Sequence, residues 1–200
     1  DFAGSYPAAC GARNWAVAPV DSAQFAARAI EGMWRELGGQ LSGAVRDGRV
    51  PQGLEAAMVI ESEALSQVVR DINKYSNNVM AQQVFLTLGL QRNGVASWDG
   101  AQAALRQWWQ QRVGAQTLPV VENGAGLSRE ERVTAQGLGR MLQVAWGSPV
   151  VPEFLASLPV LGVDGTLRRN QARASGQAHL KTGSLRDTSA IAGYVHAASG

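Results

Sequence analysis

Apolar side chains recur every three or four residues in several segments of the chain, which is the spacing of an amphipathic helix. The first of these helices is expected to begin at Asp21 or Ser22, either of which can cap it, and to stop at the glycine pair 38–39. Ser97 and Thr134 are placed to cap two later helices. The expected helices span residues 22–37, 63–73, 79–88, 97–113 and 134–145.

The pattern changes near the end of the chain, where two short segments favour strands. Residues 178–182 and 189–196 are the candidates, and the turn residues between them predict an antiparallel hairpin. Several helices followed by a hairpin, without an internal repeat, predict the α+β class.

Composition narrows the range of functions. The 200 residues fit one domain, or one domain with part of another, and 46% of them are hydrophobic. The formal net charge is only +2 and the basic residues are scattered, which argues against a nucleic-acid or membrane-surface partner. Cys10 is the only cysteine, so it is either a free thiol or paired with a cysteine outside these residues. Lysine is rare and occurs only at positions 74 and 181, which suggests that its chemistry is needed there.

Two short motifs carry residue types that suit catalysis. Residues 181–184, Lys-Thr-Gly-Ser, end the first expected strand, where a glycine allows a ligand to approach closely. An ammonium and two hydroxyls at that point suit a carboxylate. Residues 76–78, Ser-Asn-Asn, interrupt a helical pattern. Taken singly, the first motif is explained as a hairpin turn and the second as a helix cap.

Taken together with their flanks, the motifs resemble one known family. In penicillin-recognising serine enzymes, a Ser-x-Asn loop between helices and a Lys-Thr-Gly strand line opposite sides of one cleft. Most of residues 20–196 resembles the D-alanyl-D-alanine carboxypeptidase/endopeptidase family of low-molecular-mass class C penicillin-binding proteins, peptidase family S13. The four blocks that carry the resemblance are residues 71–81, 123–129, 162–167 and 181–185.

The resemblance implies a β-lactamase/transpeptidase-like fold with an antiparallel sheet and helices. It implies a periplasmic enzyme that trims peptidoglycan stem peptides through an acyl-enzyme and is trapped by β-lactams. Neither a cofactor nor a metal is implied.

The resemblance also assigns roles to the motif residues. Ser76 would relay a proton to the leaving amine, Asn78 would hold the substrate amide, and Lys181 would supply positive potential. The terminal carboxylate would bind the hydroxyls of the second motif, and one backbone N–H there would stabilise the oxyanion. The implied substrate-binding residues are Thr182, Gly183 and Ser184, the last of which carries that N–H.

The nucleophile of that family, the serine of a Ser-x-x-Lys motif, is absent from this sequence. The residues three positions before the two lysines are Asp71 and Ala178. The chain is therefore expected to be a C-terminal portion that associates with an upstream segment. Residues 1–53 would be the end of an inserted region returning into the main domain, and residues 54–200 would be part of the transpeptidase-like domain.

Two alternatives stay open at this point. Tyr75 and Asn77 also fit the Tyr-x-Asn pattern of class C β-lactamases, so a β-lactamase or an esterase on the same fold is one alternative. The other is a non-catalytic cell-wall-binding domain. The preference for carboxypeptidase or endopeptidase cleavage and the oligomeric state are also left open.

Other polar residues are expected to have structural roles. Lys74 is interpreted as a charge at the surface or at a helix end, and Asp164 as a helix cap. His179 and His196 lack the spacing of zinc ligands. The pair Trp108 and Trp109 is expected to pack within a helix.

The missing nucleophile gives a first testable prediction. The 200-residue chain alone should form no covalent adduct with a labelled penicillin, because a serine hydroxyl without an activating base is a poor nucleophile. Mass spectrometry after incubation with the labelled compound provides the measurement. A stoichiometric acyl adduct on any serine of the chain would contradict both the portion hypothesis and the role given to Ser76.

Overall fold

A computed structural model describes residues 3–13 and 21–197. The chain divides into two compact units, Asp1–Ile60 and Glu61–Gly200. The sequence analysis placed a boundary between residues 53 and 54, with residues 1–53 as the end of an inserted region. That assignment stays a prediction.

The described residues of the first unit, 3–13 and 21–60, contain one α-helix. Short 3-10 helices at Ala8–Cys10 (η1) and Ser22–Gln24 (η2) come before α1, which spans Phe25–Glu36. The Asp21 side chain accepts a hydrogen bond from the backbone N–H of Ala23, so the expected helix start is confirmed. None of the described residues in this unit is buried.

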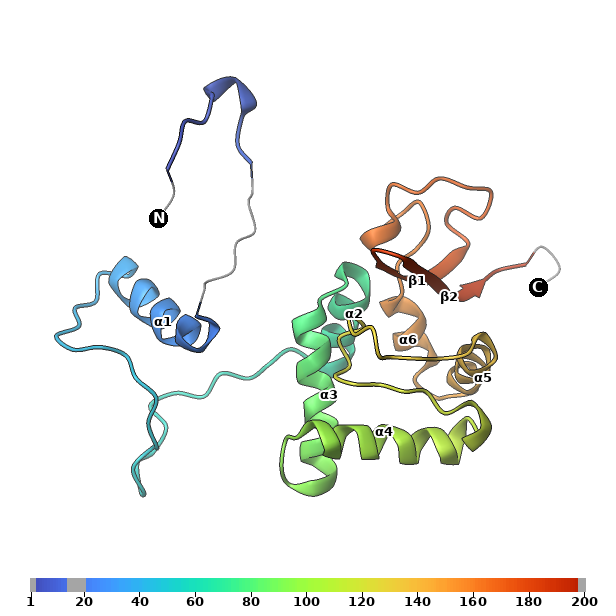
Figure 1. The fold of residues 1–200 in the computed structure, drawn as a ribbon, viewed down its shortest axis with the longest axis horizontal. Coiled ribbons are helices and arrows are strands. Elements are labelled where there is room, and N and C mark those ends of the chain that lie inside the picture. The colour runs from blue at the N-terminus through green and yellow to red at the C-terminus, as the bar shows by residue number, and fades with distance from the viewer. Residues whose placement is uncertain (1–2, 14–20, 198–200) are drawn as a thin grey trace. The chain divides into compact units, whose positions relative to one another are not determined.

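The second unit holds the remaining helices and the only strands among the described residues (Figure 1). Ser97 and Thr134 cap their helices by accepting hydrogen bonds from the N–H groups of Gly100 and Gly137, as the sequence predicts. The α-helices are α2 (Leu65–Tyr75), α3 (Asn78–Asn93), α4 (Trp98–Arg112), α5 (Ala135–Trp146) and α6 (Val151–Ser157). The 3-10 helices are η3 (Ala115–Thr117) and η4 (Gly165–Leu167).

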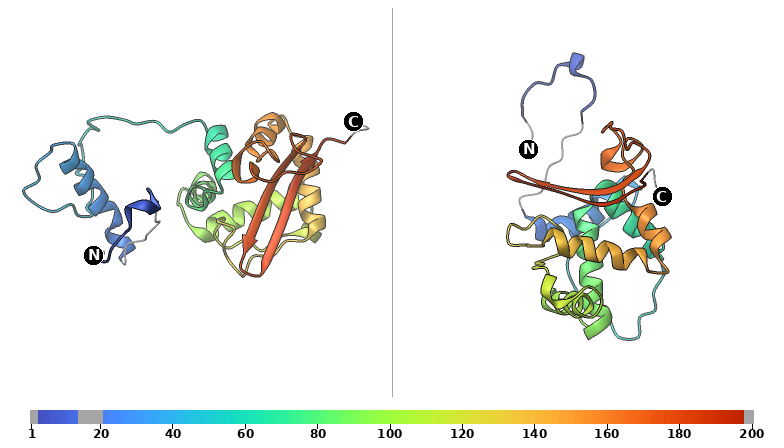
Figure 2. Two further views of the ribbon diagram at one scale, coloured as in Figure 1. Left: turned by 90° about the horizontal axis from the view of Figure 1, so that it is seen from above. Right: turned by 90° about the vertical axis from the view of Figure 1, so that its right-hand side faces the viewer.

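The C-terminal hairpin pairs β1 (Ala178–Leu185) with β2 (Thr188–Val195) in antiparallel register. Ala178 lies opposite Val195 and Leu185 opposite Thr188, so the two-residue turn at 186–187 connects them. Figure 2 shows the hairpin as a long curved ribbon lying over helices of this unit. The predicted hairpin and the α+β class are confirmed.

Helix α6 is the α-helix of the described residues that the sequence did not predict. It has only seven residues, too few for helical periodicity to be recognised, and its one local signal is a proline in the first turn. The helix forms where it packs against α2. Tertiary contact therefore determines it more than local preference does.

Close packing of α3 on α4 depends on small residues. Gly89 of α3 lies against the start of α4, where an added Cβ would be 2.9 Å from the Ala101 nitrogen and 3.0 Å from the Ser97 carbonyl oxygen. Ala101 is fully buried there, and the Phe85 ring stacks on Trp98 with 6.5 Å between centroids. Of the tryptophan pair expected to pack within a helix, Trp109 is 4% exposed and confirms the expectation, whereas Trp108 is 37% exposed and does not. No helix within residues 3–13 and 21–197 has the length and apolar character to cross a membrane.

This packing predicts opposite effects for two glycine-to-alanine changes. Gly89→Ala should lower the free energy of unfolding by about 1–3 kcal/mol, because the methyl group pushes α3 off the α4 backbone. Gly139→Ala in α5, where nothing lies within 4 Å of the added Cβ, should raise it by about 0.5–1 kcal/mol through helix propensity. Urea denaturation of both variants tests this, and equal effects would contradict the close approach.

Candidate active site

The connection between α2 and α3 has a strained backbone. Ser76 lies between the two helices with φ 53° and ψ 49°, and it is the only described residue other than glycine with positive φ. Its backbone N–H donates to the Ile72 carbonyl, and Asn77 then caps α3 by accepting from the Met80 N–H. A serine in the left-handed region costs free energy, so surrounding contacts must hold it there.

Lys181 makes the contact that crosses from strand β1 to this turn. Its Nζ donates to the Ser76 Oγ at 2.6 Å and to the Thr182 carbonyl at 2.7 Å. The two residues are 105 positions apart in sequence. Burial lowers the pKa of the Lys181 ammonium, because loss of solvent disfavours its charged form. The structure thus brings together the hydroxyl and the ammonium that the sequence singled out.

Asn78 fixes the turn to the glycine-rich loop at residues 123–126. Its Nδ2 donates to the Ala125 carbonyl at 2.7 Å. The loop itself is held by the Asn123 side chain, which accepts from the Ala125 N–H at 3.0 Å. Gly124 packs on Phe85, because a Cβ added at Gly124 would lie 2.7 Å from the Phe85 Cβ and Cγ atoms. Sequence reasoning gave this loop no chemistry, although it lay in one of the four resembling blocks.

These elements surround a cleft of about 630 Å³. Among the described residues that line it, Lys181 is the only charged one, so the cleft has positive potential and suits an anionic ligand. Helices α5 and α6 supply part of its apolar lining, and α2 and β2 contribute Ile72 and Ile191. The lining includes all the candidate site residues: Ser76, Asn78, Lys181, Thr182, Gly183 and Ser184.

The Tyr-x-Asn alternative finds less support in this geometry. The Tyr75 side chain is 70% exposed and does not line the cleft, whereas Ser76 lines it and contacts Lys181.

The described residues contain no group of three or more histidines, cysteines or acidic side chains that could hold a metal.

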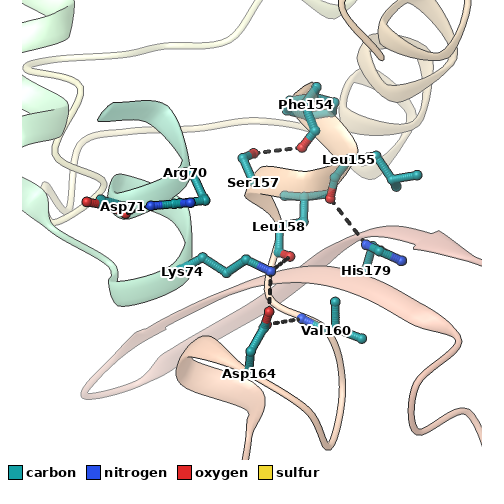
Figure 3. Close-up of polar contacts among 10 residues, drawn as sticks. All are labelled: Arg70, Asp71, Lys74, Phe154, Leu155, Ser157, Leu158, Val160, Asp164 and His179. Atoms are coloured by element: carbon teal, nitrogen blue, oxygen red, sulfur yellow. Dashed lines mark hydrogen bonds and ion pairs between the residues drawn. The ribbon is translucent and has the colours of Figure 1, made fainter. Parts of the chain in front are cut away.

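Lys74 lies in the last turn of α2, which confirms the helix-end interpretation, but it is not a surface charge. Lys74 is 9% exposed, and its Nζ lies 2.6 Å from Asp164 Oδ2 (Figure 3). Asp164 comes just before η4, but its side chain makes no capping hydrogen bond to that helix. The sequence could not show this pairing, because the two residues are 90 positions apart and each alone resembles a helix-end residue.

Comparison with known proteins finds a match to the D-Ala-D-Ala carboxypeptidase 3 (S13) family over residues 1–200. A D-alanyl-D-alanine carboxypeptidase of Actinomadura sp. (strain R39) is 33% identical over 190 residues, which are 88% of this chain and 34% of that protein. Carboxypeptidase DacB of Mycolicibacterium smegmatis is 29% identical over 163 residues, 76% of this chain and 35% of that protein. The chain thus spans about a third of the length of these curated relatives.

Solved structures show the same fold. Penicillin binding protein 4 (dacB) from Haemophilus influenzae, complexed with a β-lactam, superposes with a TM-score of 0.75 at 24% identity. The match covers 92% of this chain and 43% of that one. The expected β-lactamase/transpeptidase-like fold is therefore confirmed for this portion.

The left-handed turn yields a prediction about stability. Ser76→Ala and Ser76→Gly both remove the hydroxyl that Lys181 contacts, but only alanine keeps a Cβ in the unfavourable region. The glycine variant should therefore be more stable than the alanine variant by about 0.5–1 kcal/mol in free energy of unfolding. Thermal or urea unfolding of the pair measures the difference. An alanine variant as stable as the glycine variant would mean that the turn is not strained.

Proposed function

The chain belongs to the D-Ala-D-Ala carboxypeptidase 3 (S13) family, and from this premise we propose that the complete protein is a serine-type D-Ala-D-Ala carboxypeptidase or endopeptidase. It acts on peptidoglycan stem peptides in the periplasm and binds β-lactams. The observation that carries the proposal is the 2.6 Å contact between Lys181 Nζ and Ser76 Oγ at the cleft. It joins the two motifs that acyl transfer in this family requires.

The reaction divides between this chain and sequence outside it. The serine of a Ser-x-x-Lys motif outside these 200 residues attacks the carbonyl carbon between the two D-alanines. The C–O bond forms as the serine hydroxyl gives up its proton to the lysine of its own motif, and the C–N bond breaks as the departing D-alanine amine takes up a proton, so the number of protons is unchanged. Water then cleaves the ester and restores the serine hydroxyl, which makes two moderate steps out of one difficult hydrolysis.

Ser76 and Lys181 together deliver the proton that the leaving amine takes up. A hydroxyl next to an ammonium is a better proton donor than a hydroxyl alone, because the positive charge stabilises the alkoxide form. The Lys181 ammonium keeps the Ser76 hydroxyl polarised, and Ser76 passes the proton to the amine nitrogen. The strain at Ser76 supports this role, since strained backbone clusters at functional sites.

Substrate binding uses the other lining groups. The hydroxyls of Thr182 and Ser184, beside the only charged group of the described lining, receive the terminal carboxylate of the peptide or of a β-lactam. Gly183 keeps that part of β1 free of a side chain, so the substrate can lie close to the strand. The N–H of Ser184 stabilises the oxyanion. Asn78, whose Nδ2 is held by the Ala125 carbonyl, offers Oδ1 to a substrate N–H.

Removal of the Lys181 charge should impair acylation strongly. In the complete protein, Lys181→Ala should lower the second-order rate of acylation by a β-lactam by about two orders of magnitude. Lys181→Arg should recover only part of it, because a planar guanidinium does not replace a compact ammonium in a narrow cleft. Stopped-flow or gel-based acylation kinetics measure these rates.

The control removes an exposed cation of α4 instead. Arg106→Ala changes the net charge by the same amount and lies outside the cleft lining, so its acylation rate should stay near that of the wild type. Lys74→Ala would be a poor control, because Lys74 is buried and paired. No loss at position 181 would favour the non-catalytic alternative.

A further inference from the structure

Lys74, in the last turn of α2, forms a part-buried ion pair with Asp164 that the proposed chemistry does not use; the lysine side chain is 11% exposed and the aspartate side chain 41%. Lys74 Nζ donates to Asp164 Oδ2 at 2.6 Å and to the Leu158 carbonyl at 2.7 Å (Figure 3). Asp164 Oδ1 accepts from the Val160 N–H at 2.7 Å. Burial alone would raise the pKa of Asp164, but the bonds from Lys74 and Val160 and the Lys74 charge bring it below its ordinary value. The carboxylate is therefore ionised at neutral pH.

Residues 158–164, which carry the two acceptors of the Lys74 ammonium, form backbone hydrogen bonds with strand β1. The Leu161 N–H donates to the Ala178 carbonyl at 2.9 Å, and the Leu180 N–H donates to the Pro159 carbonyl at 2.9 Å. Leu180 is the residue immediately before Lys181. A shift of residues 158–164 relative to α2 would therefore move the strand that carries Lys181.

The backbone that follows Asp164 packs closely on the backbone of α2 at Lys74. Gly165, with φ +55°, leaves no room for a side chain, because a Cβ there would lie 2.6 Å from the Lys74 carbonyl oxygen. Ser76 follows Lys74 by two residues. Ser76 and Lys181 are therefore connected in two ways. They contact each other directly, and they are also linked through Lys74, residues 158–164 and β1.

We propose that Lys74 and Asp164 are positioning residues that hold the strained turn at Ser76 within hydrogen-bond distance of Lys181. The expected effect on acylation rests on the function proposed above, whereas the expected effect on the position of Lys181 does not. The desolvation of a buried lysine opposes the attraction of its partner, and the partner here is 41% exposed, so the pair contributes little net stability compared with apolar side chains of similar volume. An ammonium with two fixed acceptors defines one relative placement of α2 and β1.

The test separates positioning from stability with three variants of the complete protein. Asp164→Asn leaves the buried Lys74 ammonium without its counter-charge. Lys74→Met/Asp164→Asn removes both charges, keeps the volume and keeps an acceptor for the Val160 N–H, so it should regain part of the lost stability. Thr117→Val is the matched control, since it deletes the buried hydroxyl that accepts from Trp109 Nε1 at 3.3 Å, outside the cleft lining.

Two readouts are taken well below every unfolding midpoint. The first is the rate of acylation by a β-lactam, which should fall about ten- to a hundredfold in both variants that lack the ion pair, because small misplacements of a reacting group are costly. The second is the NMR signal of the Lys181 ε-carbon in protein labelled at lysine, assigned by its loss in Lys181→Arg. That signal should shift in both of these variants and stay unchanged in Thr117→Val.

The outcomes are distinct. An unchanged Lys181 signal in the double variant, or an acylation rate that recovers together with stability, would overturn the positioning role. If the wild type is not acylated at all, the proposed function fails, but the Lys181 signal still decides the inference. If Asp164→Asn does not fold, the double variant supplies both readouts.

Discussion

The serine at the end of α2 sets the main constraint on the second unit. With φ at 53° it lies in a region that residues with a Cβ avoid, and only it and Asn77 separate two helices. The conformation is held from several directions: by the Lys181 ammonium on Oγ, by the cap at Asn77, and by Asn78 on the glycine-rich loop. These long-range contacts from β1 and the glycine-rich loop compensate for the local cost of the turn.

In the function proposed above, Lys181, the one charged side chain among the described residues of the cleft lining, both attracts the substrate carboxylate and polarises the Ser76 hydroxyl. Desolvation makes the ammonium costly, and its two acceptors, the Ser76 hydroxyl and the Thr182 carbonyl, offset part of that cost. The same desolvation strengthens its attraction for an anionic substrate group. The neighbouring hydroxyls of β1 then give that group directional hydrogen bonds, which a charge alone does not provide.

Much of the fold could be predicted because its signals are local. Helical periodicity, the caps at Ser97 and Thr134, and the short turn between two strand segments involve residues close in sequence. The candidate site was located by the order of two motifs and by family resemblance. Helix α6, the burial of Lys74 and the role of the loop around Ala125 were missed, because each depends on a partner far away in sequence. Lys74 in particular has the local pattern of an ordinary helix-end lysine.

The most direct test of the account is a crystal structure of the complete protein after acylation by a penicillin. The account predicts an ester on a serine outside these 200 residues, with the penicillin carboxylate within hydrogen-bond distance of the Thr182 or Ser184 hydroxyl. It also predicts that Ser76 stays unmodified and in contact with Lys181, on the side of the former lactam nitrogen. An ester on Ser76, or a carboxylate turned away from β1, would contradict the assignment of this cleft.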